Sequence, residues 1–308
     1  MSYWSVIGSG VTGLCVATEL QARGASLEVI VDAQKPAASA LAGGMLAPWC
    51  EAESAPQEVS VAGAAALAWW AAHVSGVERQ GSLVLAPARD SAELTRFARL
   101  TRGHQWVEPG ALEADLAGRF ARGLYFPEEG HLDPRRALAE LQARLIEQNV
   151  PFHEGAPVGR VIDCRGMAAA DQLSDLRAVR GEMVILQTRE VALARPLRLL
   201  HPRFPCYLVP RGEGRFMLGA TMVESHDDSP ISARALMELL GSAYAIHPAF
   251  AEARILETGT GLRPAFADNM PAIRRQNDII YVNGMYRHGF LLAPIMAQRL
   301  MQQLEQEL

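Results

Sequence analysis

Residues 3–13 read YWSVIGSGVTG, and this stretch decides the fold of the amino-terminal part of the chain. Its first five residues are mostly apolar and predict a buried strand, and the glycines that follow have the spacing that joins such a strand to a helix. The helix is expected to end at Arg23, before Gly24, and a second strand is expected over residues 27–31. The sequence therefore predicts a parallel βαβ unit of the dinucleotide-binding type.

Each glycine of this unit has its own task at the predicted ligand. Gly8 allows the tight turn after the strand, Gly10 lets the backbone approach a pyrophosphate, and Gly13 lets helix and strand pack closely. The phosphates would lie at the helix amino terminus, where unpaired N–H groups favour negative charge. Asp32, nineteen residues after Gly13, is placed to accept hydrogen bonds from a ribose, and its charge disfavours NADP. The predicted ligand is FAD or NAD.

Length and composition further limit the class of protein and the kinds of partner that we expect. The chain has 308 residues, enough for two domains, with 49% apolar and 20% charged residues and a net charge of −5. It has no basic excess, so we expect a small-molecule substrate and neither nucleic acid nor a membrane as partner. Its four cysteines are scattered without metal-ligand spacing, and the first strand leaves no room for a secretion signal. We therefore expect no metal and a cytoplasmic protein.

Residues 59–74 are the most membrane-like part of the sequence. They are rich in alanine, include Trp69 and Trp70, and are too few to span a bilayer as a helix. We expect a packed helix here. The alternative is an interfacial anchor, because paired tryptophans also suit membrane surfaces.

The remaining elements alternate between two kinds of structure. Helices are expected over 90–101, 109–120, 134–149 and 233–245 and from 292, and strands over 80–86, 158–163, 181–188, 206–210, 215–222 and 279–283 and near Ile255. This order predicts an α/β fold, a Rossmann-like nucleotide domain that an antiparallel-sheet domain interrupts. We expect the nucleotide domain to comprise 1–75, 130–178 and 256–308, and the second domain 76–129 and 179–255.

Other polar residues show no pattern of a site. His226, Asp227 and Asp228 are expected to form a solvated turn, because three adjacent side chains rarely point at one ion. Glu51 and Glu53 are expected in a solvated loop, and the alternative is a position at the mouth of the pocket. No role is assigned to four further histidines, His104, His131, His201 and His247.

Five separated motifs carry a family resemblance over nearly the whole chain. They are ASALAGGMLAPWCE at 38–51, CYLVPR at 206–211, GATM at 219–222, GLRP at 261–264 and NGMYRHGFLLAP at 283–294. Together they resemble the D-amino-acid oxidase superfamily of flavoproteins, and within it the glycine oxidases of thiamine synthesis, the ThiO family. His288 departs from the pattern, because longer members commonly carry asparagine there.

The resemblance implies that the cofactor is FAD and that small residues after the second strand surround the flavin. It also implies a last flavin contact at the start of the terminal helix, and an adenine contact from the backbone of Val158. The expected cofactor residues are Gly8, Gly10, Val11, Thr12, Gly13, Asp32, Ala33, Ser39, Gly43, Gly44, Met45, Val158, Gly166, Met285, Tyr286, Arg287, His288, Gly289, Phe290 and Leu291.

Four residues are implied at the substrate. Arg263 matches the carboxylate-binding arginine, a role that suits a guanidinium because it can hold both carboxylate oxygens. Tyr207 matches a tyrosine that helps to hold the carboxylate, Met222 a residue that lines the pocket, and Arg287 a second arginine at the site. The alternatives are a core tyrosine, a packing methionine and a structural arginine.

The implied reaction is oxidation of glycine or a similarly small amino acid to its imine, and so to glyoxylate and ammonia, with oxygen reduced to hydrogen peroxide. The imine could pass to thiazole synthase in thiamine synthesis. Two alternatives stay open: an oxidase or dehydrogenase of sarcosine or D-amino acids, and a non-catalytic flavin-binding partner protein. The exact amine, the electron acceptor and a homo-oligomeric state are not fixed by the sequence.

Overall fold

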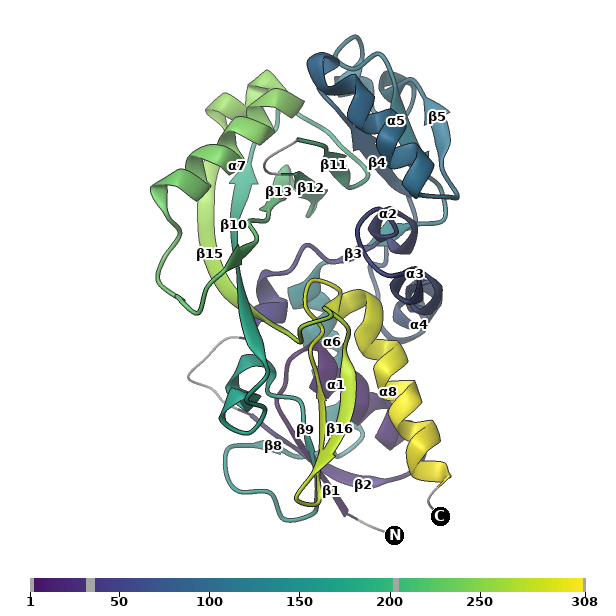
Figure 1. The fold of residues 1–308 in the computed structure, drawn as a ribbon, viewed down its shortest axis with the longest axis vertical. Helices are drawn as coiled ribbons and strands as arrows, with labels where there is room; N and C mark the ends of the chain where they lie inside the picture. Colours follow the sequence, from purple (N-terminus) through teal and green to yellow (C-terminus); the bar gives the residue numbers. More distant parts are fainter. Residues whose placement is uncertain (1–2, 32–36, 202–204, 307–308) are drawn as a thin grey trace.

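The computed structural model describes residues 3–31, 37–201 and 205–306, and these form two sheet-based parts that lie one above the other (Figure 1). The lower part holds both chain ends, and the upper part carries α5 and α7. The α/β class and the interrupted nucleotide fold are confirmed by this architecture.

The lower sheet has six strands in the order β16-β17-β9-β1-β2-β8. All neighbours are parallel except β16 and β17. The helices α1 and α8 pack against each other beside this sheet. The bounds are β1 Tyr3–Ile7, β2 Ser26–Ile30, β8 Phe152–His153, β9 Arg160–Asp163, β16 Ala272–Gln276, β17 Ile279–Asn283, α1 Val11–Ala22, α6 Pro134–Glu147 and α8 Gly289–Glu305.

Two glycines make the turn from β1 to α1. Gly8 has φ +106°, a conformation that side chains other than glycine's rarely adopt. A Cβ on Gly13 would lie 1.8 Å from the carbonyl oxygen of Gly8, so no larger residue fits between helix and strand. The close packing that the glycine spacing predicted is thus present.

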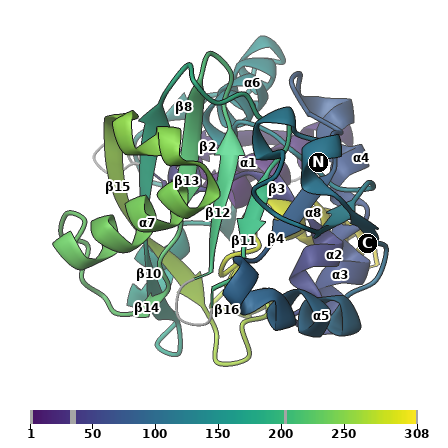
Figure 2. The same cartoon turned by 90° about the horizontal axis from the view of Figure 1, so that it is seen from above.

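The upper sheet has nine strands. Eight follow the order β14-β10-β13-β12-β11-β4-β6-β5, and β15 pairs with β10. In Figure 2, α7 lies over one side of this sheet and α5 at the other. The bounds are β4 Ser82–Leu85, β5 Gln105–Val107, β6 Gly123–Phe126, β10 Arg177–Gln187, β11 Leu197–Leu199, β12 Cys206–Pro210, β13 Arg215–Gly219, β14 Val223–Glu224, β15 Arg254–Ala265, α5 Ser91–Leu100 and α7 Ala233–Ile246.

Two expectations from the sequence differ from this layout. Residues 109–120 form two short 3₁₀ turns, Pro109–Ala111 and Ala114–Leu116, in place of the expected helix. The strand near Ile255 continues to Ala265 and stays paired with β10, so residues 256–265 belong to the upper sheet and not to the nucleotide domain. The alternation of glycine and polar residues in this strand hides its length.

The alanine-rich segment forms α3 Gln57–Gly63 and α4 Ala66–His73, after the short α2 Pro48–Glu51. Trp69 and Trp70 are buried, and their indole N–H groups donate to the Glu19 carboxylate and to the carbonyl of Phe290, each over 2.7 Å. The tryptophans therefore pack inside the protein, and the interfacial-anchor alternative is wrong. No helix in the described part of the chain is long and apolar enough to cross a bilayer.

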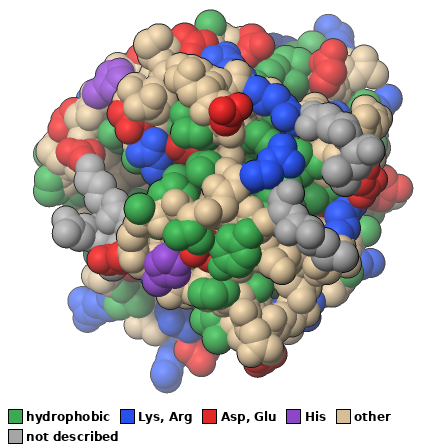
Figure 3. All heavy atoms as spheres, turned by 90° about the horizontal axis from the view of Figure 1, so that it is seen from below, with side chains coloured by type: hydrophobic (Ala, Val, Ile, Leu, Met, Phe, Trp, Pro, Cys, Tyr) green, Lys and Arg blue, Asp and Glu red, His purple; other side chains and the backbone are tan. Residues whose placement is uncertain are grey.

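The surface carries both signs of charge. On the face seen in Figure 3, acidic and basic side chains are interspersed around apolar ones, and neither sign forms a continuous patch.

Candidate active site

A cavity of about 950 Å³ lies between the two sheets. It extends from the turn after β1 to β12 and β15 of the upper sheet, and its volume is in the range of cofactor and ligand pockets. The structure brings most of the expected site residues to its wall: Gly8, Gly10, Val11, Thr12, Ser39, Gly43, Gly44, Met45, Gly166, Tyr207, Met222, Arg263, Met285, Tyr286, Arg287, His288, Gly289, Phe290 and Leu291.

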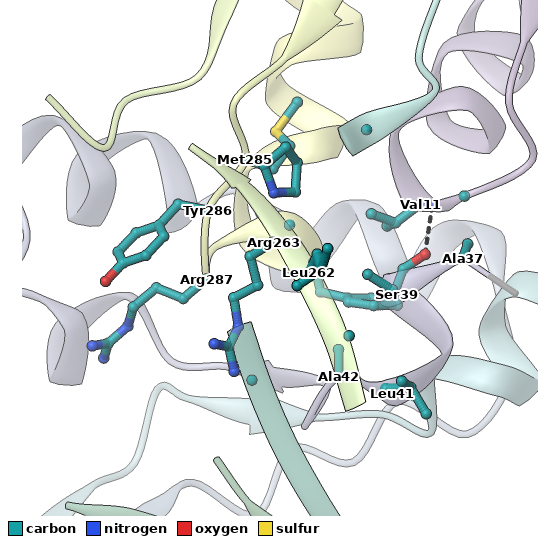
Figure 4. Close-up of a pocket in the computed structure, with 18 of the residues that line it drawn as sticks. Val11, Ala37, Ser39, Leu41, Ala42, Leu262, Arg263, Met285, Tyr286 and Arg287 are labelled. Atoms are coloured by element: carbon teal, nitrogen blue, oxygen red, sulfur yellow. Dashed lines mark hydrogen bonds between the residues drawn. The ribbon is translucent and has the colours of Figure 1, made fainter. Parts of the chain in front are cut away.

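One end of the cavity is formed by the amino terminus of α1. This terminus has no side-chain cap and no acidic residue in its first turn, so its N–H groups are suited to an anion. The Ser39 hydroxyl accepts a hydrogen bond from the Val11 amide over 3.2 Å and so places the loop after β2 against the helix (Figure 4). A dinucleotide pyrophosphate fits these groups. Asp32 and Ala33 lie outside the described residues.

The Gly43–Gly44 turn forms the middle of the cavity and is held by Arg211. The guanidinium donates to the carbonyls of Gly43 (2.8 Å), Ala42 (3.3 Å) and Leu132 (3.1 Å). Burial lowers the pKa of Arg211 to about 10, which still leaves it charged at neutral pH. Gly44 has φ +66°, and a Cβ on Gly43 would lie 2.6 Å from the Tyr207 ring. A flat ring system can thus approach this backbone without obstruction.

Arg263 extends from β15 across the far end of the cavity. Its Nη1 donates to the carbonyl of Thr221 over 3.0 Å and to that of Arg180 over 3.4 Å. Within the described ranges no carboxylate lies within ion-pair distance of this guanidinium. Burial lowers its pKa, an effect that Tyr207 opposes. Among the described residues, this charge therefore has carbonyl partners and no carboxylate counter-ion.

Arg287 is arranged differently, because it has a carboxylate partner. Its Nη2 lies 2.8 Å from Oε2 of Glu51. Burial alone would lower the pKa of Arg287, but the Glu51 charge outweighs it and raises that pKa. Burial likewise opposes ionisation of Glu51, but Arg287, His288 and Arg198 hold the pKa of its carboxyl well below the usual range.

Glu51 corrects the sequence interpretation. Its side chain is 18% exposed and lines the cavity at the end of α2, and Glu53 pairs with Arg198 and Arg96. The expectation of a solvated loop is wrong for both, because their arginine partners come from distant elements. Pro48 was the available signal, since proline at a first helical position predicts a helical turn that includes Glu51.

His288 lies at the start of α8, a second helix terminus that faces the cavity. The imidazole Nε2 is 2.9 Å from Oε2 of Glu51, and the residue is buried. Its Nδ1 is buried and has no hydrogen-bond partner among the residues that the structure describes. The first turn of α8 has no acidic residue, so its N–H groups can face the electronegative edge of a bound ring.

Val158 does not reach this site. It precedes β9, which runs parallel to β1, and its amide donates to Glu28 Oε1 and Ser5 Oγ, each over 3.2 Å. It therefore lies toward the amino-terminal ends of the strands, whereas the cavity lies at their carboxyl ends. Val158 is thus not among the residues that line the cavity, and its contact with adenine stays a prediction.

The other histidines and acids form no further site. In the part of the chain that the structure describes, no group of three His, Cys, Asp or Glu residues could hold a metal ion. Asp227 accepts hydrogen bonds from the amide and hydroxyl of Ser229, as expected of a polar turn, while His226 and Asp228 reach the cavity wall. His131 is buried, and burial lowers its pKa to about 4.

Figure 4 shows the two ends of the cavity in one view. Val11 and Ser39 lie at one side, and the side chains of Arg263, Tyr286 and Arg287 extend at the other. A helix terminus for a dinucleotide and a buried guanidinium for an anion thus share one space. This arrangement is that of a dinucleotide-binding enzyme with a cavity between its two sheets.

The chain belongs to the family of FAD-dependent oxidoreductases, which matches residues 4–303. FAD is therefore the cofactor, as the motifs implied. The chain is 52% identical over 305 residues to a Rhizobium etli protein named as thiamine biosynthesis oxidoreductase ThiO, covering 95% of this chain and 93% of that protein. It is 26% identical over 338 residues to the bifunctional protein ThiO/ThiG of Nostoc sp., covering 95% of this chain and 51% of that protein.

Solved structures show the same fold at lower identity. The glycine oxidase of Geobacillus kaustophilus superposes with a TM-score of 0.81 at 21% identity, covering 99% of this chain and 95% of that one. The iminodiacetate oxidase of Chelativorans sp. BNC1 superposes with a TM-score of 0.83 at 21% identity, covering 98% and 95%.

Proposed function

We propose that the protein oxidises glycine, or an amino acid of similar size, to its imine with FAD as cofactor and oxygen as electron acceptor. The imine hydrolyses to glyoxylate and ammonia, and oxygen becomes hydrogen peroxide. The observation that carries this proposal is the buried Arg263 guanidinium, which faces the cofactor cavity without a carboxylate partner among the described residues.

The charges around Arg263 favour a substrate with one carboxylate. Glu51 neutralises Arg287, and Glu53 pairs with Arg198, so these arginines are already occupied. Arg263 remains to bind an anion, and its planar fork matches the two oxygens of a carboxylate. Substrate binding would supply the counter-ion that this buried charge lacks.

Tyr207 is placed to assist Arg263. Its ring lies between two glycines, because a Cβ on Gly43 would be 2.6 Å from the ring and a Cβ on Gly219 would be 3.2 Å from the hydroxyl. The packing of the ring against these two glycines thus fixes the position of the Tyr207 hydroxyl. In this proposal, Arg263 and Tyr207 orient the carboxylate so that the substrate Cα faces the cofactor.

The chain's part in the reaction is to hold two molecules in place. Bound FAD would supply the two-electron redox chemistry between substrate and oxygen. The α1 terminus would hold the pyrophosphate, the Gly43–Gly44 turn would border the ring, and the N–H groups at the start of α8 would stabilise negative charge on it. The substrate must bind with its amino group unprotonated, because its lone pair assists the loss of hydride from Cα.

Relatives support a place in thiamine synthesis. The Rhizobium etli protein carries that role in its name, and the Nostoc protein joins a ThiO part to a ThiG part in one chain. We propose that the imine passes to thiazole synthase. The four free, buried cysteines are consistent with the reducing cytoplasm as the site of action.

An anaerobic titration of the FAD-loaded protein tests this function. Glycine, sarcosine and D-alanine are added separately, and loss of the oxidised-flavin absorbance is recorded. Glycine is expected to bleach the flavin at the lowest concentration, and Arg263→Lys, which keeps the charge but loses the fork, is expected to need far more. Bleaching by sarcosine or D-alanine but not by glycine would show that glycine is not the substrate. No bleaching by any amine would favour a non-catalytic flavin protein.

A further inference from the structure

Met222 occupies an unusual position for a methionine. Met222 lines the cavity and is 45% exposed, so a small molecule in this space can reach its side chain. Of the other methionines at the cavity wall, Met183 and Met285 are buried. Among the described methionines only Met222 and Met237 are exposed, and Met237 lies on α7, away from the cavity.

The sulfur of Met222 is also surrounded by hydrogen-bond donors. It lies 3.7 Å from the Tyr286 hydroxyl and 3.6 Å from Nη1 of Arg287. A thioether is a weak acceptor, whereas a sulfoxide oxygen is a strong one. The surroundings of Met222 would therefore stabilise its oxidised form better than its reduced form.

We propose that Met222 is oxidised to the sulfoxide by the hydrogen peroxide that the enzyme forms in this cavity, and that this oxidation limits the number of turnovers. The inference rests on the proposed oxidase function. In the step, the sulfur lone pair attacks one peroxide oxygen, the S–O bond forms and the O–O bond breaks. The leaving hydroxide takes the proton from the oxygen that is now bound to sulfur and becomes water. Sulfur thus loses two electrons and the peroxide gains them.

Oxidation at this position would alter substrate binding. A sulfoxide oxygen would accept hydrogen bonds from Tyr286 and Arg287 and hold both residues more firmly at the cavity wall. Thr221, the residue before Met222, carries the carbonyl that accepts from Arg263. A bulkier and more polar side chain at 222 would shift this carbonyl and with it the guanidinium that binds the carboxylate.

The test compares Met222 with Met237 in the FAD-loaded enzyme by peptide mass spectrometry. In one arm the enzyme turns over glycine in air with catalase, which removes peroxide from bulk solution. In the other arm dilute hydrogen peroxide is added without substrate or catalase. Because Met237 is 69% exposed, added peroxide should oxidise it at least as fast as Met222, whereas turnover with catalase should oxidise Met222 several-fold more than Met237.

Variants give the functional readout. Met222→Leu keeps the side-chain volume but has no sulfur to oxidise. Its turnover rate, expressed as a fraction of its own initial rate, should therefore decline several-fold more slowly than that of the wild type, whereas the rate of Met237→Leu should decline like that of the wild type. Oxygen consumption with Met222 no more oxidised than Met237 would overturn this inference alone. Absence of oxygen consumption with every amine would overturn the proposed function and the inference together.

Discussion

The guanidinium of Arg263 lies directly over the α carbon of Gly181. A Cβ at position 181 would be 2.2 Å from Nη2 and 2.3 Å from Cζ of Arg263. In the antiparallel pairing of β10 with β15, Gly181 is opposite Gly261, two residues before Arg263, so the arginine side chain crosses diagonally above the glycine. The absence of a side chain at 181 therefore determines where the charge can lie.

Gly181→Ala is expected to displace Arg263 and weaken substrate binding. The methyl group has no space, and the long arginine side chain is the part that can move. We expect kcat/KM for the amino acid to fall roughly 10- to 100-fold, since charge-assisted hydrogen bonds contribute about 1.5–3 kcal/mol. Gly241→Ala in α7 is the matched control, because nothing lies within 4 Å of its Cβ. Equal kinetics for both variants would contradict the role of Gly181.

Glu51→Gln is expected to destabilise the fold through Arg287. The substitution leaves the partly buried Arg287 guanidinium without its counter-ion, and His288 loses its carboxylate partner. The free energy of unfolding should fall by about 1–2 kcal/mol, which is less than for a fully buried ion pair because the side chains of Arg287 and Glu51 are 21% and 18% exposed. Urea unfolding measures this, and Glu58→Gln, at an exposed position of α3, should change it by less than about 0.5 kcal/mol.

Arg211→Gln is expected to loosen FAD binding. The variant loses the hydrogen bonds that hold the carbonyls of Ala42, Gly43 and Leu132, so the Gly43–Gly44 turn is no longer fixed before the cofactor binds. The Kd for FAD, measured by fluorescence titration, should rise about tenfold or more. Arg215→Gln is the matched control and should leave the Kd for FAD unchanged. Arg215 lies in the same hairpin, but it is exposed and pairs only with Glu213 among the described side chains.

Glu129 is expected to make stability depend on pH. It accepts hydrogen bonds from the Cys50 amide and the Ser82 hydroxyl, and burial raises the pKa of its carboxyl to about 7. A folded-state pKa above the unfolded value of 4.5 means that the native state binds the proton more tightly. Protonation of Glu129 therefore contributes its full stabilisation of the native state below pH 4.5, and this contribution is lost as the pH rises to about 7.

Glu129→Gln isolates this effect, because glutamine has nearly the same shape and no titrating proton. The stability of the wild type minus that of the variant should fall by at most about 3 kcal/mol between about pH 5 and about pH 8. Chemical unfolding at several pH values measures the difference, in which other titrating groups cancel. A difference that stays constant, or that grows with pH, would contradict the protonation of Glu129 in the native state.

The sequence predicted the first strand, the glycine turn and the helix after it well, because their signals are local. The glycines at 8, 10 and 13 act within one strand, turn and helix, and Asp133 and Pro134 begin α6 as their types predict. The strands Cys206–Pro210 and Ile279–Asn283 were also predicted with their observed bounds.

The parts that the sequence did not predict depend on partners that are distant along the chain. Nothing in the sequence around Glu51 indicates its ion-pair partners, because Arg287 and Arg198 come close to it only in the folded chain. Gly181 has no motif around it, and its role follows only from the register of β10 against β15. The amide of Val158 donates to Ser5 and Glu28, and the short segment before Val158 does not reveal these partners.

A crystal structure of the FAD-loaded protein with glycolate, a small carboxylate without the amino group, tests the central claim most directly. We expect both carboxylate oxygens within hydrogen-bond distance of the Arg263 guanidinium, with the Tyr207 hydroxyl beside them and Arg287 still paired with Glu51. A carboxylate bound by Arg287 instead, with Arg263 still donating only to the carbonyls of Thr221 and Arg180, would contradict it.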